Sequence, residues 1–106
     1  MSKLSRDRGQ SYEREICTAL SDHLGITIRR QLGQERDGGG DIRTGRFLLE
    51  CKRRRRLGGP YTWMAQATAA AKPGETPAVI ARADGGESLV ILRLHDFLRL
   101  AREELA

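Results

Sequence analysis

The sequence predicts an α/β domain in which helices cover both faces of a central mixed sheet. The chain has 106 residues, of which 39% are hydrophobic, so it can form one modest core and we expect a single domain over residues 1–106. Amphipathic helical segments occur near the start, in the middle and at the end, with short β-type runs between them. The expected order of elements is α-β-β-β-α-β-β-α.

The first helix is expected from Gly9 or Gln10 to Leu24, after a flexible basic arm at residues 1–7. Gly25 supplies the residue that ends the helix. Apolar side chains recur with a spacing of about four residues and form one stripe. The members of this stripe are Tyr12, Ile16, Ala19, Leu20 and Leu24, with Cys17 at its margin.

Glu13 is the unusual acid of this helix. On a helical wheel it falls inside the apolar stripe, whereas Glu15 falls outside it. A carboxylate that faces the core costs free energy unless it is paired, hydrogen-bonded or bound to a metal. Glu13 is therefore a candidate site residue, and the alternative is a structural salt bridge to a buried base such as Lys52.

The central feature of the chain is a β-hairpin after a first strand at Ile26–Arg30 and a polar loop at residues 31–40. The turn is expected at Arg43–Arg46, where Gly45 supplies a positive φ angle. In the strand that follows, side chains alternate between two faces. Phe47, Leu49 and Cys51 point one way, and Leu48, Glu50 and Lys52 point the other. The hairpin brings Asp41 back towards Glu50.

Two carboxylates and a lysine at one edge of a sheet suit metal-assisted hydrolysis of a phosphodiester. Asp41 and Glu50 would bind a hard cation through oxygen. The cation would polarise the phosphate and lower the pKa of a water, while Lys52 orients that water or offsets charge. An exposed hairpin face with an ordinary Glu–Lys pair would give the same pattern, and that alternative stays open.

The second half of the chain supplies two helices and two strands. After a break at Gly58–Pro60, the expected elements are a helix at Tyr61–Lys72, strands at Pro77–Arg82 and Ser88–Arg93, and a helix at His95–Glu104. Trp63 suits core packing better than base stacking. Gln66 is a candidate for a phosphate or water contact.

The positive charge of the chain is concentrated around the hairpin. The net charge is +5, and residues 25–56 carry ten basic and four acidic residues, a net +6. Five cations follow one another from Lys52 to Arg56, where self-repulsion makes a merely solvated surface less attractive. This distribution favours a polyanionic partner.

Three segments resemble the PD-(D/E)xK nucleases, and most closely the archaeal-type and phage Holliday junction resolvases. The segments are Arg8–Ile16 (RGQSYEREI), Gly40–Ile42 (GDI) and Leu49–Lys52 (LECK). The resemblance is strong over the first half of the chain, although Gly40 replaces the proline of the nominal motif. It implies a restriction-endonuclease-like fold. It also implies catalytic roles for Glu13, Asp41, Glu50 and Lys52.

The resemblance further implies Mg²⁺, or Mn²⁺ in its place, bound by Asp41, Glu50, the main-chain carbonyl of Cys51 and Glu13. The products would carry 5′-phosphate and 3′-hydroxyl ends. Recognition would follow the shape of branched or duplex DNA, and resolution of a junction would call for a homodimer, with the alanine-rich second helix as one candidate interface. The family's basic DNA contacts would fall on Arg8 and Arg14. The charge pattern of the chain adds Arg29, Arg30, Arg53, Arg54, Arg55 and Arg56 as DNA-binding residues, with Gln66 as a further candidate.

Other functions remain open at this stage. A nicking, flap, repair or phage recombination nuclease would share the same site, and a non-catalytic DNA-binding module would use the acids only to balance the arginines. RNA binding is disfavoured because only 5% of the residues are aromatic. No apolar run approaches a membrane span, and the two cysteines form no disulfide framework, so we expect a reducing, cytoplasmic setting, including the host cytoplasm for a phage protein.

Overall fold

The computed structural model describes residues 3–28 and 40–105, with the side chains of residues 4–7, 40 and 41 outside that description. Its elements are α1 (Lys3–Leu24), β1 (Gly40–Thr44), β2 (Phe47–Arg54), α2 (Pro60–Ala70), β3 (Thr76–Ala83), β4 (Leu89–Ile91) and α3 (Leu94–Leu105). The sheet order is β1-β2-β3-β4, with β2 and β3 parallel and the outer pairs antiparallel. The predicted α/β architecture with a mixed sheet is confirmed.

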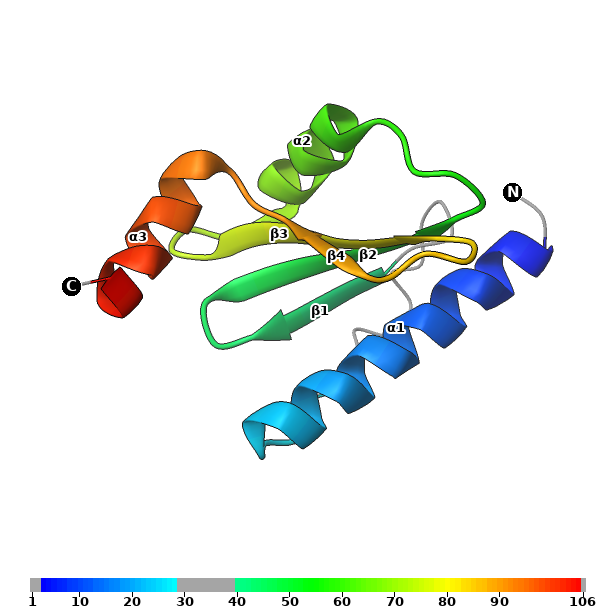
Figure 1. Cartoon of the computed structure of the whole chain (residues 1–106), viewed down its shortest axis with the longest axis horizontal. Helices are drawn as coiled ribbons and strands as arrows, with labels where there is room; N and C mark the ends of the chain where they lie inside the picture. Colours follow the sequence, from blue (N-terminus) through cyan, green and yellow to red (C-terminus); the bar gives the residue numbers. More distant parts are fainter. Residues whose placement is uncertain (1–2, 29–39, 106) are drawn as a thin grey trace.

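Helices α1 and α2 lie on opposite faces of the sheet (Figure 1). On the α1 face, Tyr12 and Ile16 pack with Leu49 and Cys51 of β2 in the larger hydrophobic cluster. On the α2 face, Ala67 packs with Val79 and Ala81, and Trp63 and Met64 border this smaller cluster. The small alanine side chain lets α2 approach β3 closely. Each face of the central strands is therefore covered by one helix.

The β1–β2 hairpin forms as the sequence predicts. Gly45 adopts a φ angle of 56°, in the region that favours glycine, and Thr44 pairs with Phe47 across the turn. The side chain of Arg43 joins this hairpin to the segment before β3, because its Nε lies 3.0 Å from Glu75 Oε2. The hairpin is thus fixed at its turn and along its outer strand.

Two predictions near the amino end are wrong. Residues 3–7 belong to α1 and are not a loose arm, because this stretch contains no proline and its polar residues continue the helix. Residues 26–28 form no strand. Instead, the Ile28 N–H donates to Ser21 Oγ at 3.1 Å and its side chain enters the core, so the segment folds back on the end of α1. Arg29, Arg30 and the predicted loop at 31–39 lie outside the described residues.

Helix α3 lies at one end of the sheet (Figure 1). Buried Asp96 pairs with Arg93 at 2.8 Å, and Arg99 donates to Thr76 Oγ1 at 2.6 Å, which joins the helix to the start of β3. Its apolar side chains are largely exposed, in contrast to the packed side expected of an amphipathic helix. None of the helices within the described part of the chain has the length and apolar character that a membrane span requires.

Candidate active site

The hairpin register places Asp41 directly opposite Glu50. Directly opposite residues of antiparallel strands occupy the same face, with Cβ atoms about 4.5–5.5 Å apart. The predicted proximity of these two positions is therefore confirmed at the level of the backbone. Two residues along β2 stands Lys52, which shares the face of Glu50 because side chains alternate along a strand.

Lys52 is buried, with 3% of its side chain exposed, and it has two polar neighbours. Its Nζ lies 3.7 Å from Glu50 Oε2 and donates a hydrogen bond to Gln66 Oε1 of α2 at 3.2 Å. A buried ammonium requires such partners, because its desolvation would otherwise exceed the attraction of one carboxylate. Gln66 therefore helps to hold Lys52 in place, and its predicted contact with phosphate or water stays a prediction.

Glu13 is buried, as the helical wheel predicts, with 1% of its surface exposed. Its helix packs on the face of β2 that carries Leu49 and Cys51. Glu50 and Lys52 occupy the opposite face of the same strand, and Lys52 contacts α2 there. The membership of Glu13 in one site with Asp41, Glu50 and Lys52 stays a prediction.

The predicted DNA-contacting arginines that the structure describes fall into three environments. Arg53 and Arg8 both pair with Asp84, at 3.5 Å for Arg8, and the hydrogen bond from Arg53 lowers the pKa of that carboxyl. Arg54 places its guanidinium 5.9 Å from the centre of the Trp63 ring. Trp63 is half-buried at the edge of the α2 cluster, so the prediction that it packs in the core is confirmed. The side chains of Arg14, Arg55 and Arg56 are exposed.

The backbone pairing of Asp41 with Glu50 suits a hard divalent cation, which prefers carboxylate oxygen. Like charges directly opposite on a sheet are destabilising, and a cation between them removes that repulsion. The main-chain carbonyl of Cys51 as a further oxygen ligand stays a prediction. Within the described residues, no group of three or more His, Cys, Asp or Glu side chains is arranged to hold a metal, and the Asp41 side chain lies outside that description.

Arg82 is a basic residue to which the sequence assigned no role. It stands directly beside Arg53, because β2 and β3 are parallel and their register pairs these two positions. The sequence indicates that both residues lie in strands, but it contains no signal for which strands are neighbours. The pairing of β2 with β3 brings Arg82 next to Arg53.

Comparison with protein families gives a match over nearly the full chain. Residues 4–104, almost the whole chain, match a family model described as "Phage putative PDDEXK endonuclease". No curated protein and no solved structure matches the chain.

Proposed function

The chain belongs to the phage PDDEXK endonuclease family, and from this premise we propose that it is a metal-dependent nuclease that resolves Holliday junctions. Membership makes the chain a nuclease of the PD-(D/E)xK superfamily, with a restriction-endonuclease-like fold and a DNA substrate. Nucleases of this superfamily typically use divalent metals. The choice of Mg²⁺, the branched substrate and the dimer are the further parts of the proposal.

One observation carries the assignment of the site. Asp41 pairs with Glu50, and Lys52 follows two residues later with its Nζ 3.7 Å from the Glu50 carboxylate. This is the placement that the D…E-x-K pattern requires: two acids opposite each other on neighbouring strands and an amine beside one of them. The β-hairpin thus supplies the proposed catalytic residues from consecutive strands.

In the proposed mechanism, Asp41, Glu50 and the Cys51 carbonyl would hold Mg²⁺ or Mn²⁺, and the predicted role of Glu13 would be to complete the site directly or through water. The bound cation would supply charge stabilisation at the phosphate and a water of lowered pKa. Lys52, held by Gln66, orients the attacking water and offsets the negative charge that develops on the phosphate. In-line attack leaves 5′-phosphate and 3′-hydroxyl ends.

The arginines hold the DNA backbone and give little information about sequence. Arginine binds phosphate through a planar fork of donors, and phosphate contacts position a protein on DNA without reading its bases. Recognition by shape follows from this composition. The proposed contacts are Arg8, Arg14, Arg29, Arg30 and the run from Arg53 to Arg56.

A four-way junction presents two equivalent strands, so a resolvase should act as a twofold dimer. The second helix, considered from the sequence as the interface, already packs Ala67 against the sheet. Large exposed apolar side chains instead lie on α3; they are Leu94, Phe97, Leu98 and Leu105. Surfaces of this kind commonly mark protein interfaces. We propose that a second copy of the chain packs on this surface. That copy would supply the second active site that cleavage of a four-way junction requires.

Cleavage of a labelled four-way junction tests the function. The assay compares the junction with a flap and a matched linear duplex, in Mg²⁺ and in EDTA. Paired symmetric cuts confined to the junction and absent in EDTA are expected. Equal cutting of flap or linear DNA would contradict the resolvase assignment and favour another nuclease of the superfamily. Binding without cutting in Mg²⁺ or Mn²⁺ would favour a non-catalytic DNA-binding module.

A further inference from the structure

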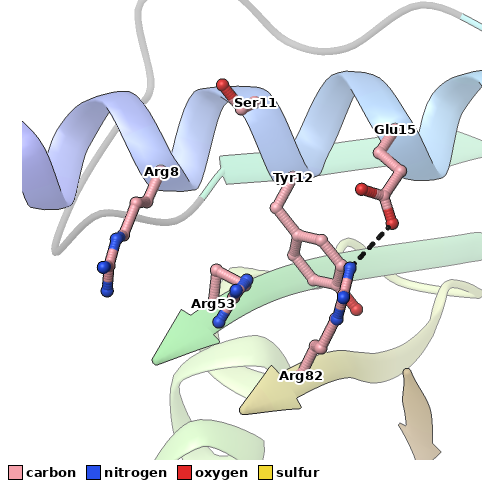
Figure 2. A pocket seen from close by; sticks show the side chains of 6 residues that line it. All are labelled: Arg8, Ser11, Tyr12, Glu15, Arg53 and Arg82. Atoms are coloured by element: carbon pink, nitrogen blue, oxygen red, sulfur yellow. Dashed lines mark hydrogen bonds and ion pairs between the residues drawn. The ribbon is translucent and has the colours of Figure 1, made fainter. Parts of the chain in front are cut away.

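A basic pocket lies between α1 and the ends of β2 and β3, and the proposed catalytic residues do not line it. Its volume is about 320 Å³, and its lining residues are Arg8, Ser11, Tyr12, Glu15, Arg53 and Arg82. Figure 2 shows Arg8 and Tyr12 projecting from α1 towards Arg53 and Arg82 on the two strands. The pocket thus joins three arginines that are distant in sequence.

This pocket occupies the opposite face of the sheet from Lys52. Arg53 follows Lys52 in β2 and pairs with Arg82 in β3, so both arginines share the face of Cys51 and Ile80. That face is the one covered by α1. Because consecutive Cα atoms are about 3.8 Å apart, Lys52 on one face and Arg53 on the other lie at almost the same position along β2.

The charges of the pocket are only partly balanced. Arg82 NH1 lies 3.5 Å from Glu15 Oε2, and Arg8 and Arg53 share the single carboxylate of Asp84. Three guanidinium groups against two carboxylates leave an excess of one positive charge. Each guanidinium carries five donors, and the exposed fractions of the Arg8, Arg53 and Arg82 side chains are 43%, 20% and 33%. Donors therefore remain for a ligand that enters from solvent.

We propose that this pocket binds a non-scissile backbone phosphate of the DNA substrate, and this inference rests on the proposed nuclease function. Converging guanidinium forks are suited to a phosphate, whose oxygens accept bidentate hydrogen bonds. The cavity accommodates a phosphate together with ordered water, since one water takes about 30 Å³ in the liquid.

The position of the pocket indicates where the bound DNA strand would run across the protein. Parallel strands β2 and β3 end on the same side of the sheet, at Arg54 and Ala83. DNA that crosses these ends reaches the α2 face, with Glu50 and Lys52, and the α1 face, with Arg53 and Arg82. One phosphate at the pocket would fix the register of the backbone relative to the phosphate that is cut.

In the absence of DNA, Glu15 is the counter-ion of Arg82. Because a phosphate and Glu15 compete for the same guanidinium, removal of the carboxylate charge should favour DNA. Substitutions of the basic and the acidic residues of the pocket should therefore have opposite effects. Loss of Arg82 should weaken DNA binding, and loss of the Glu15 charge should strengthen it.

The first test measures the salt dependence of binding for Arg82→Gln. The probe is a fluorescent duplex with 5′-hydroxyl ends, in EDTA, and Arg102→Gln on exposed α3 is the control with the same change in net charge. Loss of one phosphate contact should lower the slope of log K against log salt by about 1 and weaken binding on the order of fivefold. A slope equal to that of Arg102→Gln would overturn the proposal. Loss of affinity only for a 5′-phosphorylated duplex would also overturn it, because the site would then take a terminal phosphate.

The second test uses Glu15→Gln, with Glu103→Gln of α3 as its control, and remains decisive if Arg82→Gln fails to fold. Tighter binding than the control, by about twofold or more, is expected, and equal or weaker binding contradicts the competition. These assays distinguish failure of the nuclease function from failure of the pocket. Wild-type protein that binds DNA with the expected dependence on Arg82 but does not cut it would refute the nuclease function and keep the pocket. Protein that cuts DNA with an unchanged slope in Arg82→Gln would refute only the pocket.

Discussion

Asp41 and Glu50 are directly opposite each other in the β1–β2 hairpin, three residue pairs from the pair that closes the turn. Their proximity depends on the register of this hairpin. A slip of one residue would move one strand's side chains to the other face of the sheet. The turn at Gly45 and the proposed catalytic pair are therefore parts of one arrangement.

The positive φ angle of Gly45 makes this turn sensitive to substitution. Gly45→Ala should destabilise the protein by about 1 kcal/mol, because a side chain is strained in the left-handed region, while Gly45→Asn should lose less. Thermal unfolding measures the difference. The control is Gly58→Ala, since Gly58 has no positive φ and no atom within 4 Å of an added Cβ. Equal melting temperatures for the two alanine variants would contradict the assigned turn.

Gln66 is expected to act through Lys52. The variant Gln66→Ala removes the acceptor 3.2 Å from Lys52 Nζ and should lower the cleavage rate at saturating DNA by roughly tenfold, with little change in DNA affinity. Exposed Thr68→Ala on the same helix is the control. A loss of affinity at an unchanged maximal rate would instead indicate that Gln66 contacts the DNA itself.

Glu75 links acid stability to the hairpin. The Lys72 backbone N–H and the Arg43 side chain bond to its carboxylate and lower its pKa below the ordinary 4.5. Since the pKa is depressed in the folded protein, this stabilisation is present above pH 4.5 and is lost as the pH falls through the folded pKa. At neutral pH, Glu75→Gln should be less stable by about 1–2 kcal/mol.

Denaturant unfolding of the wild type and Glu75→Gln across a pH series measures this dependence. The two free energies of unfolding should converge as the pH falls below the folded pKa of Glu75. Exposed Glu104→Gln, at the end of α3, serves as the control and should follow the wild type throughout. A gap that stays constant at all pH values would show that the carboxylate charge is not the source of the stability.

The apolar side of α3 should mediate assembly. Phe97→Glu places a charge within the exposed apolar surface and should convert a dimer to a monomer, as measured by light scattering after gel filtration. Arg102→Glu adds the same side chain to α3 outside this surface and should leave the dimer intact. A wild-type protein that is monomeric both alone and on junction DNA would contradict the dimer.

The elements that the sequence predicted well are those with strong local signals. The hairpin follows from the glycine of its turn and the alternation around Glu50, and α2 follows from Pro60 at its start. The segment 26–28 has β-branched residues typical of a strand, yet its backbone bonds to Ser21 instead of a neighbouring strand. The β-preference of a segment does not determine which strand it pairs with, and without a neighbouring strand to pair with the segment does not form a β-strand.

The relative positions of the candidate site residues along the hairpin were predictable to the same degree. Asp41, Glu50 and Lys52 could be brought together by one short hairpin, so spacing along the chain was sufficient. Arg82 was not predictable, because its place beside Arg53 depends on the parallel pairing of strands separated by α2. The exposed apolar side of α3 was likewise hidden, since the same periodicity is typical of a helix packed on its own core.

The most direct test of the central claim is the parallel measurement of cleavage and binding for Asp41→Ala. We expect Asp41→Ala to abolish cleavage in Mg²⁺ and Mn²⁺, while DNA binding is unchanged or tighter because one negative charge is removed from the site. Asp22→Ala, on the exposed side of α1, should cut and bind like the wild type. If Asp41→Ala retains wild-type cleavage, the metal site formed by Asp41 and Glu50 is wrong.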